Sequence, residues 1–296
     1  MTGGVWDGIV RLRAEALEVL AARHGGTIVA GGRVKPERIV PPLVARDGDL
    51  APLLSARHVG AAREAAARGA ALLVDASFRR AVENAAALWV CDQAMWAMAG
   101  LLDEAVVPAL AALVGEGSSI APSAVLGPRV VVGRRVRISA GTVVGHAGFG
   151  WAFGQGGAVR AVPQLAGVVI EDDVVIGPLC TIDAGTLTPT RVRRGAKLDA
   201  HVHVGHNADV GEDTIVAAQC GFAGSVTIGR GVLIGGQAGV ADHVRVGDGA
   251  RIAAKSGVIG DVPSGAVVAG YPAVARARWL RALAVLYRGT GQRGKA

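Results

Sequence analysis

Aliphatic residues recur at every sixth position along the second half of the chain. Twelve consecutive repeats between residues 192 and 258 carry Val, Leu, Ile or Phe at this position, and the residue that follows is nearly always small. A period of six belongs neither to an α-helix nor to an alternating strand. It is the period of the hexapeptide parallel β-helix. We therefore predict that each hexad forms a short strand with an inward aliphatic side chain, followed by a tight corner at the small residue.

Three hexads close one triangular coil in this class of repeat, so the chain returns to the same face after 18 residues. The fold class predicted is mainly β: a left-handed parallel β-helix, with a small N-terminal α/β domain and a C-terminal helix. Shorter ladders over 120–144 and 170–182 extend the solenoid toward the N-terminus. Interruptions at 146–167 and 188–191 are expected to form loops on its outside, where ligands often bind.

The remaining segments lack the six-residue period. Residues 1–115 are predicted to form a small α/β domain, residues 116–275 the β-helix, and residues 276–296 a basic helix or tail that either caps the solenoid or docks a partner. The elements expected in the first of these are an early helix that includes Val10, Leu12, Leu17, Leu20 and Ala21, strands over 27–30 and 71–74, and helices over 60–67 and 95–114. In the tail, Leu280, Leu283 and Tyr287 have helical spacing.

Composition agrees with the ladder. The 296 residues include 44 Gly, while aromatic residues make up only 4%. A solenoid of this kind needs many small corner residues and few rings. The mean hydropathy is +0.41, but no evenly apolar stretch is long enough to span a bilayer. Three scattered Cys and an N-terminus without the features of a signal peptide lead us to expect a cytoplasmic protein.

The formal net charge of +7 indicates an acidic partner, which could be a phosphorylated ligand, a nucleic acid or an acidic protein. Because the Arg residues are dispersed and are not accompanied by stacking aromatics, nucleic acid is the least favoured of the three.

The densest polar cluster of the ladder contains three His residues between positions 201 and 206, and His243 follows. Coil arithmetic places Gly224 one coil above His206, and His243 two coils above it and one step sideways. A strand spacing of about 4.8 Å would put all three on one face. An imidazole base beside a backbone N–H is the minimum required for acyl transfer, whereas ordinary surface His residues are the alternative.

Several motifs resemble one family. The segments GFGWA, TIDAG, LDAHVHVGHNADVG, AGSVTIG and VPSGAVVAGYPA, in this order, are similar to the bacterial UDP-3-O-acylglucosamine N-acyltransferases of lipid A biosynthesis. The resemblance implies a uridine-binding N-terminal domain, a homotrimer with active sites between subunits, and transfer of a 3-hydroxyacyl chain from acyl carrier protein to the 2-amine of a UDP-sugar. It implies no metal and no cofactor beyond the carrier's phosphopantetheine.

The same resemblance implies roles for individual residues. His206 would be the general base, the Gly224 N–H the oxyanion donor, and His243 an auxiliary polar group. Asp199 would orient His206, or else would bond its own corner backbone. The residues implied to bind substrate are Phe149, Gly150, Trp151, Asp199 and Asn207.

Two other functions remain open from the sequence. A metal enzyme like the γ-class carbonic anhydrases would use the five-residue separation of His201 and His206, although Leu165 occupies the position of the third ligand. A non-catalytic trimeric nucleotide-sugar-binding or scaffold protein would explain why Ala147, Ala184 and Ala200 stand where the family motifs carry polar residues.

Overall fold

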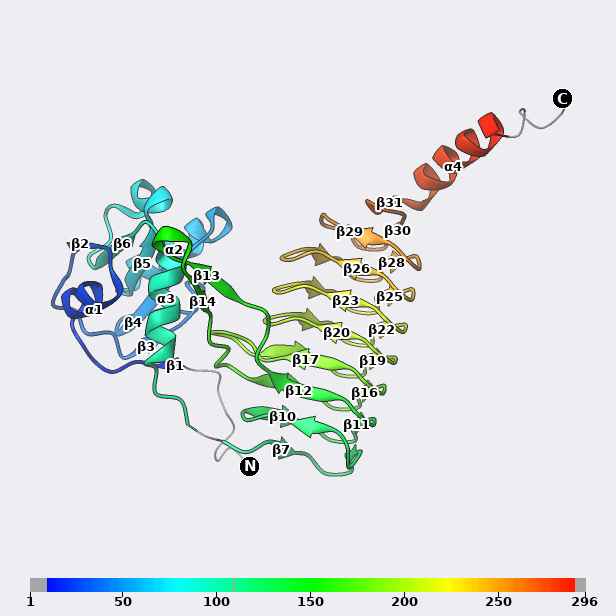
Figure 1. The fold of residues 1–296 in the computed structure, drawn as a ribbon, viewed down its shortest axis with the longest axis horizontal. Helices are drawn as coiled ribbons and strands as arrows, with labels where there is room; N and C mark the ends of the chain where they lie inside the picture. Colours follow the sequence, from blue (N-terminus) through cyan, green and yellow to red (C-terminus); the bar gives the residue numbers. More distant parts are fainter. Residues whose placement is uncertain (1–9, 109, 291–296) are drawn as a thin grey trace. The chain divides into compact units, whose positions relative to one another are not determined.

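The computed structural model describes residues 10–108 and 110–290, which form two compact units (Figure 1). The first unit contains the described residues up to 110 together with 147–167 and 185–189. The second contains residues 111–146, 168–184 and those from 190 onward. The chain therefore leaves the second unit twice and returns to it.

The first unit is built on a six-stranded sheet with helices on both faces. Its strand order is β1 (Val10–Arg11), β3 (Arg38–Ile39), β4 (Asp49–Leu53), β5 (Ala71–Asp75), β6 (Leu88–Cys91) and β2 (Thr27–Ala30). Strands β3 to β6 are parallel, and the two edge strands are antiparallel to their neighbours. The helices are α1 (Leu17–His24), α2 (Val59–Ala67) and α3 (Ala94–Asp103), with short 3₁₀ turns η1 (Ala56–His58), η2 (Ala76–Val82) and η3 (Gln155–Gly157).

Most elements predicted for this unit are confirmed within a residue or two, and two predictions are wrong. The first helix begins only at Leu17, because Val10 pairs with Ile39 across the sheet instead of joining the helix. The helix expected over 95–114 ends at Asp103, and the chain then passes Pro108, which has no N–H to continue a helix. In both places the pattern of apolar residues predicts one continuous helix, but the chain changes direction within it.

The segment 147–167 is more than the external loop expected from the sequence. It contains an antiparallel hairpin of β13 (Trp151–Phe153) and β14 (Val159–Ala161). Ala152 and Val162 are buried in the hydrophobic core that α1 and α3 share with the sheet. This interruption of the ladder thus supplies core residues to the first unit.

The second unit is a left-handed β-helix of hexapeptide repeats with three parallel sheets as its faces. One face consists of β7 (Leu113–Val114), β10 (Val130–Val132), β15 (Val168–Ile170), β18 (Thr190–Val192), β21 (Asp209–Val210), β24 (Thr227–Ile228) and β27 (Arg245–Val246). The next contains β8 (Ser119–Ile120), β11 (Arg137–Ile138), β16 (Val175–Ile176), β19 (Lys197–Leu198), β22 (Ile215–Val216), β25 (Leu233–Ile234), β28 (Arg251–Ile252), β30 (Val267–Ala269) and the antiparallel β31 (Val274–Ala275). The third consists of β9 (Val125–Leu126), β12 (Val143–His146), β17 (Thr181–Asp183), β20 (His203–Val204), β23 (Gly221–Phe222), β26 (Gly239–Val240) and β29 (Gly257–Val258).

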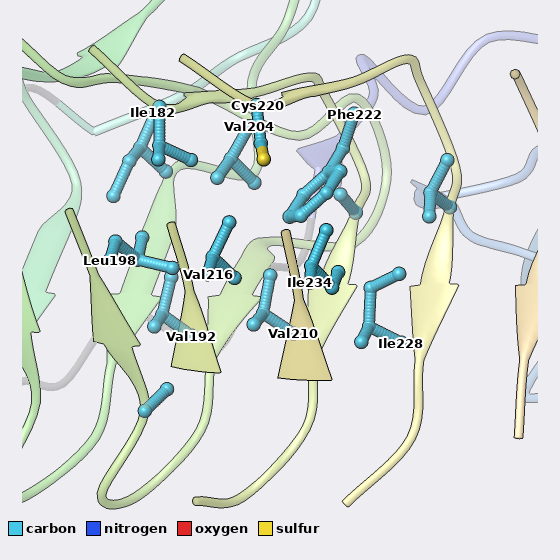
Figure 2. Close-up of a cluster of buried hydrophobic side chains, with 14 of the residues drawn as sticks. Ile182, Val192, Leu198, Val204, Val210, Val216, Cys220, Phe222, Ile228 and Ile234 are labelled. Atoms are coloured by element: carbon cyan, nitrogen blue, oxygen red, sulfur yellow. The ribbon is translucent and has the colours of Figure 1, made fainter. Parts of the chain in front are cut away.

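The predicted ladder is confirmed. The twelve residues at the six-residue ladder positions from Val192 to Val258 are at most 3% exposed, and their side chains fill the inside of the solenoid (Figure 2). Leu198 pairs with Val216, and Val216 with Ile234, so one coil takes 18 residues. Across the two interruptions Val132 still pairs with Ile170, and Ile170 with Val192. The inserted residues therefore leave the register of the coils intact.

The corners turn differently from the prediction. The small residue after each aliphatic is required by crowding: a Cβ on Gly205 would lie 2.8 Å from the Phe222 carbonyl oxygen of the next coil. The turn itself is made two residues later, in the left-handed region that L-residues seldom occupy. Twelve non-glycine residues, all at such corners, have φ between 54° and 62°: Arg129, Arg135, Asp173, Leu179, His201, Asn207, Asp213, Gln219, Ser225, Gln237, His243 and Lys255.

The C-terminal helix α4 (Arg276–Thr290) follows β31 and contacts β30 and β31. It confirms the helical part of the predicted tail, and residues 291–296 lie outside the described range. Along the described ranges 10–108 and 110–290, we find no helix with the length and apolar character needed to cross a membrane.

Candidate active site

One corner of the solenoid carries the predicted base and its neighbours on successive coils. His206 lies between β20 and β21, and its carbonyl accepts a 2.8 Å hydrogen bond from the Ser225 N–H. The His243 N–H donates in turn to the Gly224 carbonyl at 3.0 Å. The structure therefore brings His206, Gly224 and His243 together as the coil arithmetic predicts, with His243 one step to the side.

The His206 ring is half-buried and is oriented by the next residue. Its Nδ1 lies 3.1 Å from the Asn207 Oδ1. Because an amide oxygen only accepts, this contact assigns the proton to Nδ1 and leaves the Nε2 lone pair free. Asn207 is itself held by its N–H, which donates to Thr190 Oγ1 at 2.8 Å. Asn207, a predicted substrate-binding residue, thus contacts the candidate base directly.

Gly224 provides the space in which the ring sits. A Cβ at this position would lie 2.6 Å from Cε1 and Nε2 of His206. The φ of Gly224 is not positive, so the position needs glycine for its lack of a side chain and not for a turn. Nε2, the nitrogen left free, is therefore on the side of the ring that faces the Gly224 backbone.

The Gly224 N–H is open to a ligand. At each corner the N–H two residues past the aliphatic does not take part in the backbone-to-backbone hydrogen bonds between coils. Carboxylates cap several of these groups, as at Ala200, Arg134, Arg194 and Arg230. Within the ranges 10–108 and 110–290, no acceptor takes the Gly224 N–H. A free donor beside a free imidazole nitrogen is the arrangement that a carbonyl undergoing nucleophilic attack requires.

Asp199 does not join this corner. It lies one corner earlier, between β19 and β20, and its Oδ1 accepts a 2.7 Å hydrogen bond from the Ala200 N–H. This contact matches the alternative prediction, in which Asp199 bonds the backbone of its own corner. The position of Asp199 does not support a role in orienting His206. His201 shares that earlier corner, with φ 57°. Among the described residues no group of three or more His, Cys, Asp or Glu is arranged to hold a metal ion.

The predicted aromatic loop belongs to the first unit. Phe149 and Trp151 are exposed and meet edge to face with their ring centroids 5.9 Å apart. A Cβ on Gly150 would lie 2.7 Å from the Gln164 side-chain nitrogen, so this glycine is closely packed. Phe153 is also exposed, and it is not among the predicted site residues. Its spacing of two from Trp151 was the available signal, since alternate residues of a strand share a face.

A second group of polar residues lies beside the site and was also missed. Asp183 is buried at the end of β17, and its Oδ2 lies 3.8 Å from Nε2 of His203. The other ring nitrogen of His203 is 2.7 Å from Thr181 Oγ1. Burial raises the pKa of the Asp183 carboxyl above its ordinary value, and the imidazoles of His203, His146 and His206 oppose the shift. Asp183 belongs to the motif TIDAG, but no role was predicted for it from the sequence.

Comparisons with known proteins find hexapeptide repeats in two segments of the chain. Residues 111–146 match the family described as bacterial transferase hexapeptide (six repeats), and residues 225–256 match the hexapeptide repeat of succinyl-transferase. A solved UDP-N-acetylglucosamine acyltransferase from Bacteroides fragilis 9343 superposes with a TM-score of 0.49 at 23% identity, covering 62% of this chain and 74% of that one.

Two curated relatives share one name. The chain is 50% identical over 175 residues to the UDP-3-O-acylglucosamine N-acyltransferase of Caulobacter vibrioides (strain NA1000 / CB15N), covering 59% of this chain and 51% of that protein. It is 47% identical over 180 residues to the protein of the same name from Anaeromyxobacter dehalogenans (strain 2CP-1 / ATCC BAA-258), with 59% and 51% covered. The chain therefore spans about half the length of the curated relatives it matches.

Proposed function

We propose that this protein is an N-acyltransferase that moves a 3-hydroxyacyl chain from acyl carrier protein to the 2-amine of a UDP-3-O-acylglucosamine in lipid A biosynthesis. The observation that carries the proposal is the pairing of His206, with Nε2 free, and Gly224, with its N–H free, on adjacent coils. The names of the relatives supply the substrate class.

In the proposed reaction, Nε2 of His206 takes a proton from the amine as the nitrogen attacks the thioester carbonyl. The Gly224 N–H donates to the oxyanion that forms, and a donor of this kind typically contributes 10²- to 10³-fold in rate. The C–N bond forms, the C–S bond breaks, and the proton on His206 passes to the departing thiolate. The protein needs no cofactor of its own, because the acyl group arrives on the carrier's phosphopantetheine.

We further propose a cytoplasmic homotrimer that recognises the UDP-sugar and an acidic carrier protein. The formal charge of +7 supports an acidic partner. The helix α4 adds to this argument, since it carries Arg276, Arg278, Arg281 and Arg288 and no acidic residue. Phe149, Gly150 and Trp151 remain proposed sugar-binding residues, and their exposure leaves them accessible to a ligand.

The direct test is reconstitution. The purified 296-residue chain is incubated with UDP-3-O-acylglucosamine and acyl carrier proteins loaded with 3-hydroxyacyl chains of several lengths, and the products are read by mass spectrometry. We expect the nucleotide sugar to gain one acyl group, and the same sugar with its amine acetylated to gain none. Binding without transfer would favour the scaffold alternative, whereas stoichiometric zinc with CO₂ hydration would favour the carbonic anhydrase alternative.

Gly224→Ala is expected to lower kcat for acyl transfer by roughly 100-fold. The new Cβ would displace the His206 ring from its present position, and a small displacement of a reacting group lowers the rate strongly. Steady-state kinetics measure this, with circular dichroism to confirm that the variant folds. Gly260→Ala is the matched control, since a Cβ there meets no atom within 4 Å. Equal rates for the two variants would contradict the claim that the His206 ring needs the space beside Gly224.

A further inference from the structure

A buried carboxylate lies in the middle of the histidines around the candidate site. Asp183 ends β17, and its backbone pairs with His146 on β12. On the other side β17 pairs with β20, where His203 lies opposite Thr181. Continuing this register by one and two residues places Gly205 beside Asp183 and His206 beside Ala184. Histidines on the strand below, the strand above and the corner that carries the base therefore lie at neighbouring positions, and the charges of His203, His146 and His206 act on the Asp183 carboxyl.

Burial of a charged carboxylate at this position lowers the stability of the fold. The Asp183 side chain is only 9% exposed, whereas the ring of its nearest ion-pair partner, His203, is 48% exposed. At 3.8 Å the contact between Oδ2 and Nε2 is longer than a hydrogen bond, so the carboxylate is not compensated by a close partner there. Burying a poorly paired charge destabilises a fold, and such costs persist mainly where the group has a function.

We propose that Asp183 is a positioning residue for the base, whose buried negative charge holds His203 in place and stabilises the positive charge that His206 acquires during the reaction. This role rests on the function proposed above. Asp183 touches neither the acyl group nor the amine, and it acts through the two imidazoles.

The proton balance is unchanged by this role. The amine proton moves to Nε2 of His206 and then to the thiolate of the leaving group, while Asp183 stays ionised throughout. An imidazolium near a carboxylate in a partly buried site is favoured over an imidazolium with no counter-charge. The benefit exists only while His206 carries the proton, so it lowers the barrier without strengthening substrate binding.

The test is Asp183→Asn, a change that keeps shape and removes charge. We expect kcat for acyl transfer to fall roughly 10- to 100-fold while KM for both substrates stays within about twofold. We also expect the melting temperature to stay the same or rise, because the cost of burying the charge is removed. A merely structural Asp183 would give the reverse, a lower melting temperature and a rate that recovers when stability is restored by cooling.

The stability readout has a predicted pH dependence that does not need activity. Because the pKa of Asp183 is raised in the folded protein, the unmodified chain is favoured at low pH and loses that contribution as pH rises through the folded-state pKa. Asn does not titrate. The melting temperature of Asp183→Asn relative to the unmodified chain is therefore expected to increase as pH rises. The charged or titratable groups that act on Asp183 are His146, His203 and His206.

Asp213→Asn is the control, because Asp213 is an exposed corner residue whose φ of 54° Asn also accepts. It should match the unmodified chain in both readouts. Full kcat in Asp183→Asn, or a drop in kcat with lower stability, would overturn the proposal. An unmodified chain that transfers no acyl group would overturn the proposed function itself and this role with it.

Discussion

His206→Ala is expected to lower kcat for acyl transfer by about 10²- to 10⁴-fold, the usual loss when a general base is removed. The reason is that Nε2 is the free imidazole nitrogen at this corner, fixed by the contact between Nδ1 and Asn207 and facing the Gly224 backbone. KM should change little, since the ring acts on the proton of the amine. Single-turnover kinetics with the purified protein measure the chemical step directly.

The matched control for this variant is His201→Asn. His201 lies one corner earlier and has a left-handed backbone, which Asn tolerates. Its rate should be that of the unmodified chain. If His206→Ala retained the full rate, the base would have to be sought elsewhere, and the geometry of this corner would lose its functional meaning.

Phe222→Ala should lower the free energy of unfolding of the solenoid by about 3–5 kcal/mol, the range for truncating a buried aromatic side chain. Phe222 is completely buried and pairs with Val204 on one side and Val240 on the other, where the remaining rungs are aliphatic (Figure 2). The coil backbone cannot collapse into the cavity, because hydrogen bonds between coils fix its spacing.

Denaturant unfolding followed by circular dichroism measures this loss, and Phe222→Leu provides the comparison, with a smaller expected effect because most of the volume is kept. Hydrogen exchange should show the loss of protection centred on β20, β23 and β26. A change below about 1 kcal/mol would indicate that neighbouring rungs repack to fill the space.

The solenoid could be predicted from sequence because its order is local. Each rung such as Leu198 packs on its copy one coil away, so a fixed period determines both partner and orientation. The N-terminal unit lacks this property. Val10 pairs with Ile39, and β2 lies at the far edge beside β6, and neither pairing follows from the spacing of nearby residues. These pairings depend on which edges remain free after the central strands have assembled.

The same distinction explains the outcome at the site. His206, Gly224 and His243 could be placed because their separations are close to multiples of the coil. Asp199 precedes His206 by nearly one hexad, which gives a similar place within the repeat but a different corner of the triangle. Asp183 could not be found in this way, because its importance lies in how deeply the carboxylate is buried among imidazoles, and sequence period carries no information on depth.

The discontinuous first unit has a consequence for how this chain folds as it is made. Ala152 and Val162 complete the core formed by α1 and α3, and residues 185–189 belong to the same unit. A ribosome releases the chain from its N-terminus, so the first domain to begin folding lacks part of its core until the early coils have also been synthesised. Excising residues 10–110 as an independent domain would therefore leave an apolar surface uncovered, and a stable N-terminal fragment would need the hairpin β13–β14 joined to it by a designed linker.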